Sequence, residues 1–406
     1  MHLDHNHHLA YCTNIHPAES WEETWQALKE HTLQVRDRIL TSDLRSPITE
    51  YAIGLRLSAR AADELITQNQ LAAFQKWLAD ENCYVFTING FPYGAFHGTR
   101  VKENVYRPDW TTQERLTYTN QLFDIIAALC PSASGGSVST LPGSFKEFQA
   151  DETLIFTNLS SCAQHIEALS HKTEKDLHLG LEPEPLGHFE NTAETLAFFD
   201  RFLTWSDDPD LIKRRIGINY DTCHFALEFD DCEQSLTAFH NAGLRISKVH
   251  LSSALEFNPS DSTALKAIQQ FDEPTYLHQV LVSPDKNLPA EASAKEGPTT
   301  EKASIRRHKD LPDFFSSLTT DNRQLTTAAT ARCHFHIPLY AEPHSPLAST
   351  QQHVLDLLKY REQNPAFCTH YEIETYTWGV LPGDLQKDLT TQIAEEYQWV
   401  LNHIEK

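Results

Sequence analysis

RIGINYDTCH, residues 215–224, has the pattern of a buried strand that ends in chemically active side chains. Three bulky residues alternate with Gly217, Asn219 and Asp221, and successive side chains of a strand point to opposite faces. The pattern predicts a barrel strand whose bulky face packs under helices and whose inner face carries Asp221 at the carboxyl end. His224 follows just past the strand, where a loop would turn its imidazole back toward this carboxylate. A single Asp-x-x-His, however, is more often a capped turn.

The length, composition and charge of the chain limit its possible fold and argue against some classes of function. At 406 residues and 40% hydrophobic, the chain is long enough for one large α/β barrel or for two or three smaller domains. The formal charge of −23 argues against a nucleic-acid partner, because phosphate binding needs a basic surface. The same charge argues against binding to an anionic membrane surface.

Several features predict a cytoplasmic protein that does not insert into a membrane. The sequence has no run of about 18 apolar residues, and residues 1–8 have neither a basic nor an apolar signal region. The eight cysteines form no Cys-x-x-Cys pair, which is typical of free thiols in a reducing compartment. We expect the N-terminal histidines His2, His5, His7 and His8 to belong to a mobile terminal segment, which would bind metal adventitiously at most.

Strand patterns alternate with helical patterns along most of the chain, which predicts a parallel sheet. Eight repeats predict a closed barrel, so the expected fold is a single (β/α)8 TIM barrel over residues 1–406. No Gly-x-Gly-x-x-Gly follows the first strand, so nothing supports dinucleotide binding. The expected strands are 8–15, 51–57, 83–89, 135–140, 177–182, 215–221, 246–251 and 370–376.

The repeat is interrupted after the seventh strand. Residues 256–345 form no clear strand–helix unit, and we expect them to be an insertion over the C-terminal mouth of the barrel. The polar, proline-bearing stretch 283–304 is expected to be mobile. Short strand-like pieces occur at 276–282 and 333–339. His334 and His336 lie on one face of the second piece, where a structural role and a role in a site are equally compatible with the pattern.

The last four strands end in potential metal ligands. Glu182, Asp221, His250 and Glu374 share the face opposite the bulky residues of their strands. Three carboxylates at one mouth would repel each other unless a positive charge lies among them. Each residue alone is more often a buried or capping group, but together they predict a divalent cation, Mn, Zn, Co or Mg, with oxygen and imidazole ligands.

The same alternation predicts an ion pair one layer below this site. Two residues before His250 and Glu374 lie Lys248 and Glu372. Strands seven and eight are neighbours in an eight-stranded barrel, so these side chains should meet inside it. A lysine in a barrel interior is costly unless it is paired. The alternative is that Lys248 faces a helix and extends to solvent.

Glu, Asp, His and Glu on strands five to eight resemble the metal pattern of the xylose-isomerase-like TIM barrels, which include sugar isomerases and epimerases. The chain more closely resembles the EboE branch, described as metabolite traffic proteins, nearly from end to end. The stretches that carry this resemblance are YCTNIHP (11–17), TINGFPYGAFHGTRVK (87–102), YLHQV (276–280) and ETYTW (374–378). The superfamily implies a cytoplasmic, divalent-metal enzyme with a small polyol or carbohydrate-like substrate. The EboE branch implies a role in a secondary-metabolite pathway, beside a prenyltransferase-like membrane protein.

The resemblance also implies roles for individual residues. Glu182 and Glu374 would act as base and acid in proton transfer at a carbon beside a carbonyl, and His224 would contact a substrate oxygen. The other residues expected to bind the substrate are Asn14, His16, Asn89, His97, Arg100 and Lys102. Of these, His97, Arg100 and Lys102 could instead form a solvated basic turn. The long insertion departs from the simple epimerases and leaves the substrate open.

Two alternatives stay open at this stage. One is a carrier that binds a metabolite in the barrel mouth without converting it. The other is a metal-dependent phosphodiesterase of the endonuclease-IV type, which shares this barrel but acts on DNA. The acidic charge and the absence of a basic groove disfavour the phosphodiesterase.

Overall fold

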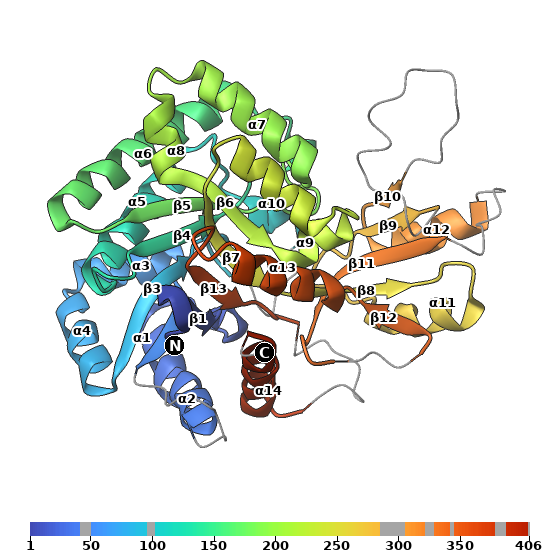
Figure 1. Ribbon diagram of the computed structural model, residues 1–406, viewed down its shortest axis with the longest axis horizontal. Coiled ribbons are helices and arrows are strands. Elements are labelled where there is room, and N and C mark those ends of the chain that lie inside the picture. Colours follow the sequence, from blue (N-terminus) through green and yellow to red (C-terminus); the bar gives the residue numbers. More distant parts are fainter. Residues whose placement is uncertain are drawn as a thin grey trace.

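The chain folds into an α/β TIM barrel (Figure 1). The computed structural model describes residues 1–40, 50–95, 102–284, 305–320, 329–341, 345–377 and 387–404. Eight parallel strands run in the order β1-β13-β7-β6-β5-β4-β3-β2, which confirms the predicted fold class. They are β1 (His8–Tyr11), β2 (Tyr51–Arg56), β3 (Cys83–Asn89), β4 (Gly136–Thr140), β5 (Leu177–Leu181), β6 (Ile216–Asp221), β7 (Ile246–Leu251) and β13 (His370–Ile373).

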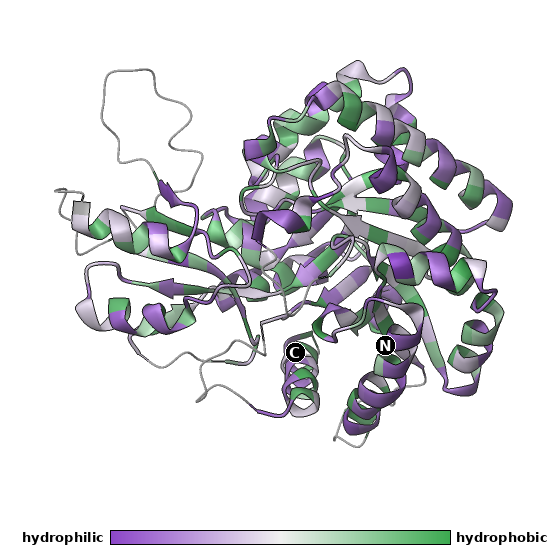
Figure 2. Cartoon of the chain, turned by 180° about the vertical axis from the view of Figure 1, so that it is seen from behind, coloured by the Kyte–Doolittle hydropathy of each residue, from purple (hydrophilic) through white to green (hydrophobic). Residues whose placement is uncertain are grey.

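Helices between the strands form the outer layer of the barrel (Figure 1). The first of them begins at Ser20, whose hydroxyl and Glu23 form a complete capping box. In Figure 2 these helices carry hydrophilic and hydrophobic residues side by side, as expected of a layer between core and solvent. They are α1 (Trp21–Ala27), α2 (Leu33–Leu40), α3 (Ala59–Thr67), α4 (Leu71–Asp80), α5 (Gln113–Leu129), α6 (Glu152–Thr173), α7 (Thr192–Trp205), α8 (Pro209–Arg215), α9 (Thr222–Leu227), α10 (Cys232–Asn241), α13 (Gln351–Gln363) and α14 (Leu389–Ile404).

Strand β6 has the two faces that its sequence predicts. The Tyr220 ring stacks on Phe225 of α9, with centroids 4.1 Å apart, and its hydroxyl lies 2.9 Å from His353 of α13. Tyr220 therefore points outward, under the helices. Asn219 points inward, where its amide reaches Glu182 at 2.8 Å. One detail differs from the expectation, because α9 begins directly at Thr222 and places His224 on a helix rather than on a loop.

The barrel closes where β1 meets β2, through a parallel bridge between Cys12 and Gly54. Gly54 has no space for a side chain, since a Cβ there would lie 2.0 Å from Glu372 Oε1 and 2.5 Å from the Tyr11 carbonyl oxygen. The glycine thus makes room for a glutamate inside the barrel.

A second, antiparallel sheet lies in the chain between β7 and α13. Its strand order is β10-β9-β11-β8-β12, and it projects to one side of the barrel in Figure 1. Within the stretch expected to be a strand at 276–282, the observed strand begins only at Val280. Of the stretch expected to be mobile, residues 285–304 lie outside the described part of the chain. The elements of this region are β8 (Ser253–Phe257), α11 (Ser262–Ile268), β9 (Val280–Ser283), β10 (Arg306–His308), α12 (Leu311–Thr320), β11 (Thr330–Ile337) and β12 (Leu347–Ser349).

The expectation of a mobile N-terminal segment is wrong for two of its four histidines. His7 and His8 are fully buried. His8 opens β1 and lies 2.9 Å from the Tyr84 hydroxyl, while His7 Nε2 lies 2.7 Å from the Pro365 carbonyl oxygen. This end of the segment is packed because His8 begins strand β1 and His7 forms a hydrogen bond with the Pro365 carbonyl. Among the described residues, no helix is both long and apolar enough to cross a bilayer.

A buried carboxyl joins the last helix to the segments around it. Glu396 of α14 is 1% exposed and accepts hydrogen bonds from the Leu339 amide at 2.9 Å and the Thr375 hydroxyl at 2.7 Å. Burial raises its pKa to about 8 despite these two bonds. The folded protein therefore keeps this proton over a pH range in which the unfolded chain has released it.

This difference predicts that Glu396 makes stability fall as pH rises. Between its ordinary value of 4.5 and about 8, the folded state binds the proton and the unfolded state does not. The loss over that window should be on the order of a few kcal/mol. The variant Glu396→Gln removes the titration and should flatten the pH dependence of the unfolding free energy, measured by urea denaturation. Identical pH slopes for the variant and the wild type would contradict this.

Candidate metal centre and substrate pocket

Four predicted ligands converge at the carboxyl ends of β5, β6, β7 and β13. Glu182, Asp221, His250 and Glu374 each offer one ligand atom, and these atoms lie within 4.8 Å of one another. His250 Nδ1 lies 3.1 Å from Glu182 Oε1, 3.6 Å from Asp221 Oδ2 and 3.0 Å from Glu374 Oε2. All four residues are buried, with exposures of 5% or less. The structure thus brings the predicted ligand set together.

Backbone hydrogen bonds fix the two glutamates just beyond their strands. The Glu182 amide donates to the Thr140 carbonyl at 2.9 Å, and the Glu374 amide donates to the Leu251 carbonyl at 3.0 Å. Both bonds continue the parallel ladder by one residue. The alternation of inward and outward side chains therefore continues one residue past each strand, and each glutamate points into the barrel.

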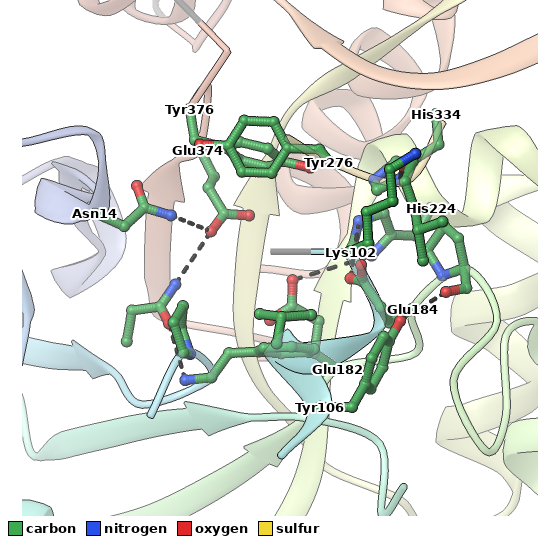
Figure 3. A pocket seen from close by; sticks show the side chains of 16 residues that line it. Asn14, Lys102, Tyr106, Glu182, Glu184, His224, Tyr276, His334, Glu374 and Tyr376 are labelled. Atoms are coloured by element: carbon green, nitrogen blue, oxygen red, sulfur yellow. Dashed lines mark hydrogen bonds and ion pairs between the residues drawn. The ribbon is translucent and has the colours of Figure 1, made fainter. Parts of the chain in front are cut away.

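Side-chain amides orient the same two carboxylates. Asn14 and Asn89 both donate to Glu374 Oε1, at 2.9 Å and 3.1 Å, and Figure 3 shows this fork. Asn219 donates to Glu182 Oε2 at 2.8 Å. Each carboxylate is left with its second oxygen directed at His250. Asn14 and Asn89, two of the residues expected to bind the substrate, thus lie beside the four ligands.

The two carboxylate oxygens of Asp221 have different roles, one in capping a helix and one in the candidate site. Oδ1 caps α9 by accepting from the amides of Cys223 at 2.7 Å and His224 at 3.1 Å, and it also accepts from the Ser252 hydroxyl at 2.6 Å. Oδ2 is buried and has no hydrogen-bond partner among the described residues. A buried carboxylate oxygen without a partner is costly, and a cation would satisfy it. The four residues therefore fit a divalent ion.

The crowding of charge shifts the pKa values of this cluster. Burial disfavours the charged form of His250, but Glu374 and Glu182 outweigh it and raise its pKa well above the usual range. Burial, with the neighbouring Glu182 and Asp221, raises the pKa of Glu374 to about 7, although His250 opposes it. The cluster is short of positive charge, as the sequence predicts.

Lys248 and Glu372 meet beneath the site, as expected from the strand alternation. Lys248 Nζ lies 2.5 Å from Glu372 Oε2, and both side chains are fully buried. The same carboxylate oxygen lies 2.9 Å from His250 Nε2. Burial disfavours the charged lysine, but Glu372 raises its pKa above the ordinary value. Glu372 thus fixes the imidazole from behind, so that Nδ1 faces the three carboxylates.

A pocket lies above the four ligands. Glu182 and Glu374 line it, together with Asn14, Asn89, Lys102 and His224 (Figure 3). Aromatic side chains form much of the remaining wall, with the Tyr276 and Tyr376 rings 5.1 Å apart. The aromatic lining residues are Phe91, Tyr106, Tyr276 and Tyr376.

Four of the residues expected to bind the substrate need comment. Lys102 lines the pocket, but its ammonium forms an ion pair with Asp310. His16 is a correction, since it is not among the residues that line the pocket; it stacks on His31 at 4.8 Å and lies 2.8 Å from the Tyr11 hydroxyl. His97 and Arg100 lie outside the described residues.

Other pocket residues had little or no signal in the sequence. Glu184 lies 3.2 Å from His224 Nε2. Burial and the surrounding carboxylates raise the pKa of Glu184 well above its usual range, although His224 opposes this. Burial disfavours charged His224, but Asp221 and Glu184 raise its pKa to about 9. His334 also lines the pocket. The Glu182-Pro-Glu184 spacing and the His-x-His alternation at 334–336 were the available signals, and neither is specific.

Comparison with known proteins gives no family assignment. No family model matches the chain, and no curated protein matches it. Similar solved structures include the probable 3-DHS dehydratase AsbF, involved in petrobactin synthesis, from Bacillus anthracis (10% identity, 97% of this chain and 98% of that chain, TM-score 0.45). Two others are an IOLI protein with a bound zinc atom (10% identity, 98% of each chain, TM-score 0.44) and a xylose isomerase domain-containing protein from Salmonella typhimurium (12% identity, 100% of each chain, TM-score 0.41). Likenesses this weak support no conclusion on family or activity.

The buried ion pair leads to a prediction for Lys248. The variant Lys248→Met leaves Glu372 buried without its lysine, which should lower the unfolding free energy by about 3 kcal/mol and weaken metal binding. Denaturant unfolding and metal content after desalting measure the two effects. The double variant Lys248→Met/Glu372→Gln should recover part of the lost stability.

Lys175→Met is the matched control for Lys248→Met. The Lys175 ammonium donates to the Ala127 and Cys130 carbonyls, each at 2.7 Å, far from the site. Its loss should leave metal content unchanged. Unchanged stability and metal content in Lys248→Met would show that the ion pair supports neither.

Proposed function

We propose that this protein is a divalent-metal-dependent enzyme of the sugar isomerase and epimerase type, acting on a small metabolite that carries a carbonyl and hydroxyl groups. One observation carries the proposal. Two carboxylates that follow different strands, Glu182 and Glu374, both line the pocket and both face the same imidazole nitrogen of His250. A pair of positioned carboxylates on two sides of a substrate suits the removal and return of a proton.

The residues that would hold the metal are Glu182, Asp221, His250 and Glu374. Their mixture of carboxylate oxygens and one imidazole suits manganese, cobalt, zinc or magnesium. When bound, such an ion polarises the carbonyl and hydroxyl oxygens of a substrate and stabilises negative charge on them. Asp221 Oδ2, which is buried and makes no hydrogen bond among the described residues, supports the presence of an ion here.

The chain's own groups would carry the proton. One carboxylate takes the proton from the carbon beside the carbonyl, and the other returns a proton either to the opposite face of that carbon or to the carbonyl carbon, in which case the hydroxyl proton also passes to the former carbonyl oxygen. The first outcome inverts the carbon, and the second moves the carbonyl. Asn14 and Asn89 hold one oxygen of Glu374, so the carboxylate presents its other oxygen in one orientation, which lowers the cost of reaching the reactive geometry.

The aromatic wall would select the substrate and exclude water. Tyr106, Tyr276 and Tyr376 supply apolar area beside the carboxylates, and water exclusion strengthens every electrostatic interaction at the reacting carbon. Because Asp310 neutralises Lys102, the pocket wall carries little net positive charge there. A neutral hydroxy-carbonyl compound fits this wall better than a multiply charged anion.

The finer assignment follows from the sequence resemblance to the EboE branch. We place the protein in the cytoplasm, in a secondary-metabolite biosynthesis or traffic pathway, with a prenyltransferase-like membrane protein as a pathway partner. Retention of the protein on membranes that contain such a partner, compared with membranes that lack it, tests this assignment. A carrier that binds the metabolite without converting it is the main alternative.

Proton transfer can be tested without knowing the natural substrate. The protein, loaded with Mn²⁺ or Co²⁺, is incubated in deuterium oxide with a panel of ketoses and other hydroxyketones. Mass spectrometry or NMR then detects deuterium at the carbon beside the carbonyl. Glu374→Gln should slow this exchange by about 100-fold or more, since positioned acid–base groups contribute roughly 10²–10⁴-fold.

Glu396→Gln is the matched control, because Glu396 is equally buried but lies outside the residues that line the pocket. It should exchange at close to the wild-type rate. Undiminished exchange by Glu374→Gln would refute the role of that carboxylate. Binding of a panel member to wild-type protein without any exchange would favour the carrier.

A further inference from the structure

We propose that Arg115 is a positioning residue for the candidate metal centre, because its guanidinium holds both ends of the loop that connects β3 to α5. This loop and the last residue of β3 supply six of the sixteen residues that line the pocket. They are Asn89, Phe91, Pro92, Lys102, Val105 and Tyr106. This role rests on the proposed function, in which Glu374 holds the metal and transfers a proton.

The hydrogen bonds of Arg115 reach both described ends of the loop. The residue lies in the first turn of α5 and is fully buried. Its Nη1 donates to the carbonyl oxygens of Gly90 at 2.8 Å and Phe91 at 3.1 Å, and its Nε donates to the Pro108 carbonyl at 2.8 Å. Gly90 and Phe91 begin the loop, and Pro108 lies near its end. One rigid, planar group therefore fixes the two ends relative to each other.

The environment of this charge indicates more than core packing. Three backbone carbonyl oxygens, rather than a carboxylate, accept the hydrogen bonds of Arg115. Its remaining amino group, Nη2, is buried and forms no hydrogen bond among the described residues. Burial lowers the pKa of Arg115 to about 10, so the group still carries its charge at neutral pH. Burying such a charge costs free energy, and an apolar side chain would fill the same space at a lower cost.

The turn that Arg115 holds sets the direction of the Asn89 side chain. The Phe91 amide donates to Asn89 Oδ1 at 3.0 Å, which leaves Asn89 Nδ2 to donate to Glu374 Oε1 at 3.1 Å. If the side-chain amide rotated by half a turn, its oxygen would face the carboxylate and neither group could donate. Arg115 thus acts on Glu374 through Asn89.

The same guanidinium brings together two rings of the pocket wall. Phe91 lies at the first end of the loop, and Tyr106 lies two residues before Pro108 at the other. Their rings pack edge to face, with centroids 5.6 Å apart. The Tyr106 hydroxyl then donates to the Pro185 carbonyl at 2.6 Å. Loss of the arginine would therefore loosen the aromatic wall as well as the Asn89 amide.

Asn14 reaches the same oxygen of Glu374 by a separate route. It donates to Oε1 at 2.9 Å from the 3-10 turn Thr13–Ile15 after β1, and Figure 3 shows it beside Glu374. The hydrogen bonds of Arg115 go to Gly90, Phe91 and Pro108, not to this turn. The two asparagines are therefore a matched pair, which act alike on Glu374 while only Asn89 depends on Arg115.

Metal affinity tests this coupling without turnover. Competition with a chromogenic chelator gives the Co²⁺ dissociation constant of each folded variant. Asn89→Ala, Asn14→Ala and Arg115→Lys should each weaken binding by roughly 10-fold, since groups that orient metal ligands contribute about 10–100-fold. Lysine keeps the charge but lacks the planar fork that reaches three carbonyls.

The double variants separate coupled from independent effects. Arg115→Lys/Asn89→Ala should bind Co²⁺ little more weakly than Asn89→Ala alone, because both changes release the same amide. Arg115→Lys/Asn14→Ala should lose roughly 100-fold, because independent effects multiply. Losses that multiply for Arg115 and Asn89 as they do for Arg115 and Asn14 would overturn the proposal.

The visible spectrum of bound Co²⁺ separates positioning from a merely structural role. Arg115→Lys and Asn89→Ala should change the spectrum in the same way, because both free Glu374 to adopt other orientations. Arg361→Lys is the matched control, since Arg361 is equally buried but donates to His7 Nδ1 at 2.8 Å, at the amino end of the barrel. It should lower stability and leave spectrum and affinity unchanged. A wild-type spectrum in Arg115→Lys would show that the arginine is only structural.

Hydrogen exchange tests the wild type itself, which matters if Arg115→Lys does not fold. Coupling between two sites is reciprocal, so bound Co²⁺ should slow exchange in peptides that contain the Phe91 amide by roughly 5-fold or more. Peptides around Arg361 should not change. Unchanged exchange at Phe91 in Co²⁺-loaded protein would refute the role of Arg115 and leave the proposed function standing. Wild-type protein that binds no metal would refute the metal centre, and this role with it.

Discussion

A single buried lysine sets the charge balance of this barrel. Three carboxylates at the mouth and Glu372 beneath them would leave a large negative charge among buried side chains. Lys248 lies at the bottom of that space and pairs with Glu372, which in turn holds His250 from behind. The neighbouring strand is adapted to this pair, because Gly54 has no side chain and so leaves room for Glu372. The orientation of the His250 imidazole in the candidate metal centre therefore follows from a charge pair one layer below it.

Ion pairs and a hydrogen bond connect the inserted sheet to the barrel near helix α9. Arg332 of β11 pairs with Glu256 of β8 at 3.0 Å and also donates to the Ala226 carbonyl at the end of α9. Arg307 of β10 pairs with the buried Glu228 just after α9. These contacts fix the insertion against the helix that carries His224. The insertion can therefore present His334 and His336 to that side chain in a defined position.

Features that depend on neighbouring residues are predicted well from the sequence. Features that depend on residues from distant segments coming together are predicted poorly. Strand alternation placed Glu182, Asp221, His250 and Glu374 on one face, because phase within a strand is a local property. The same argument paired Lys248 with Glu372, since barrel order makes β7 and β13 neighbours. The expectation for His16 was wrong, because its orientation depends on how the 3-10 turn after β1 bends. Strand alternation also left His334 and His336 undecided, because their partner His224 lies more than a hundred residues away and the inserted sheet has no repeat that fixes its position.

Asp221 shows why the structural and functional interpretations of a motif need not compete. The sequence offered a capped turn or a metal ligand for Asp-x-x-His, and the two oxygens of one carboxylate allow both. Oδ1 accepts two amides and a hydroxyl, which starts α9 where the strand stops. That start places His224 one turn along the helix, so the cap itself determines where this imidazole lies. Oδ2, left without a hydrogen bond among the described residues, then faces the candidate metal centre from the same carboxylate. The cap is therefore part of the means by which the fold builds the site.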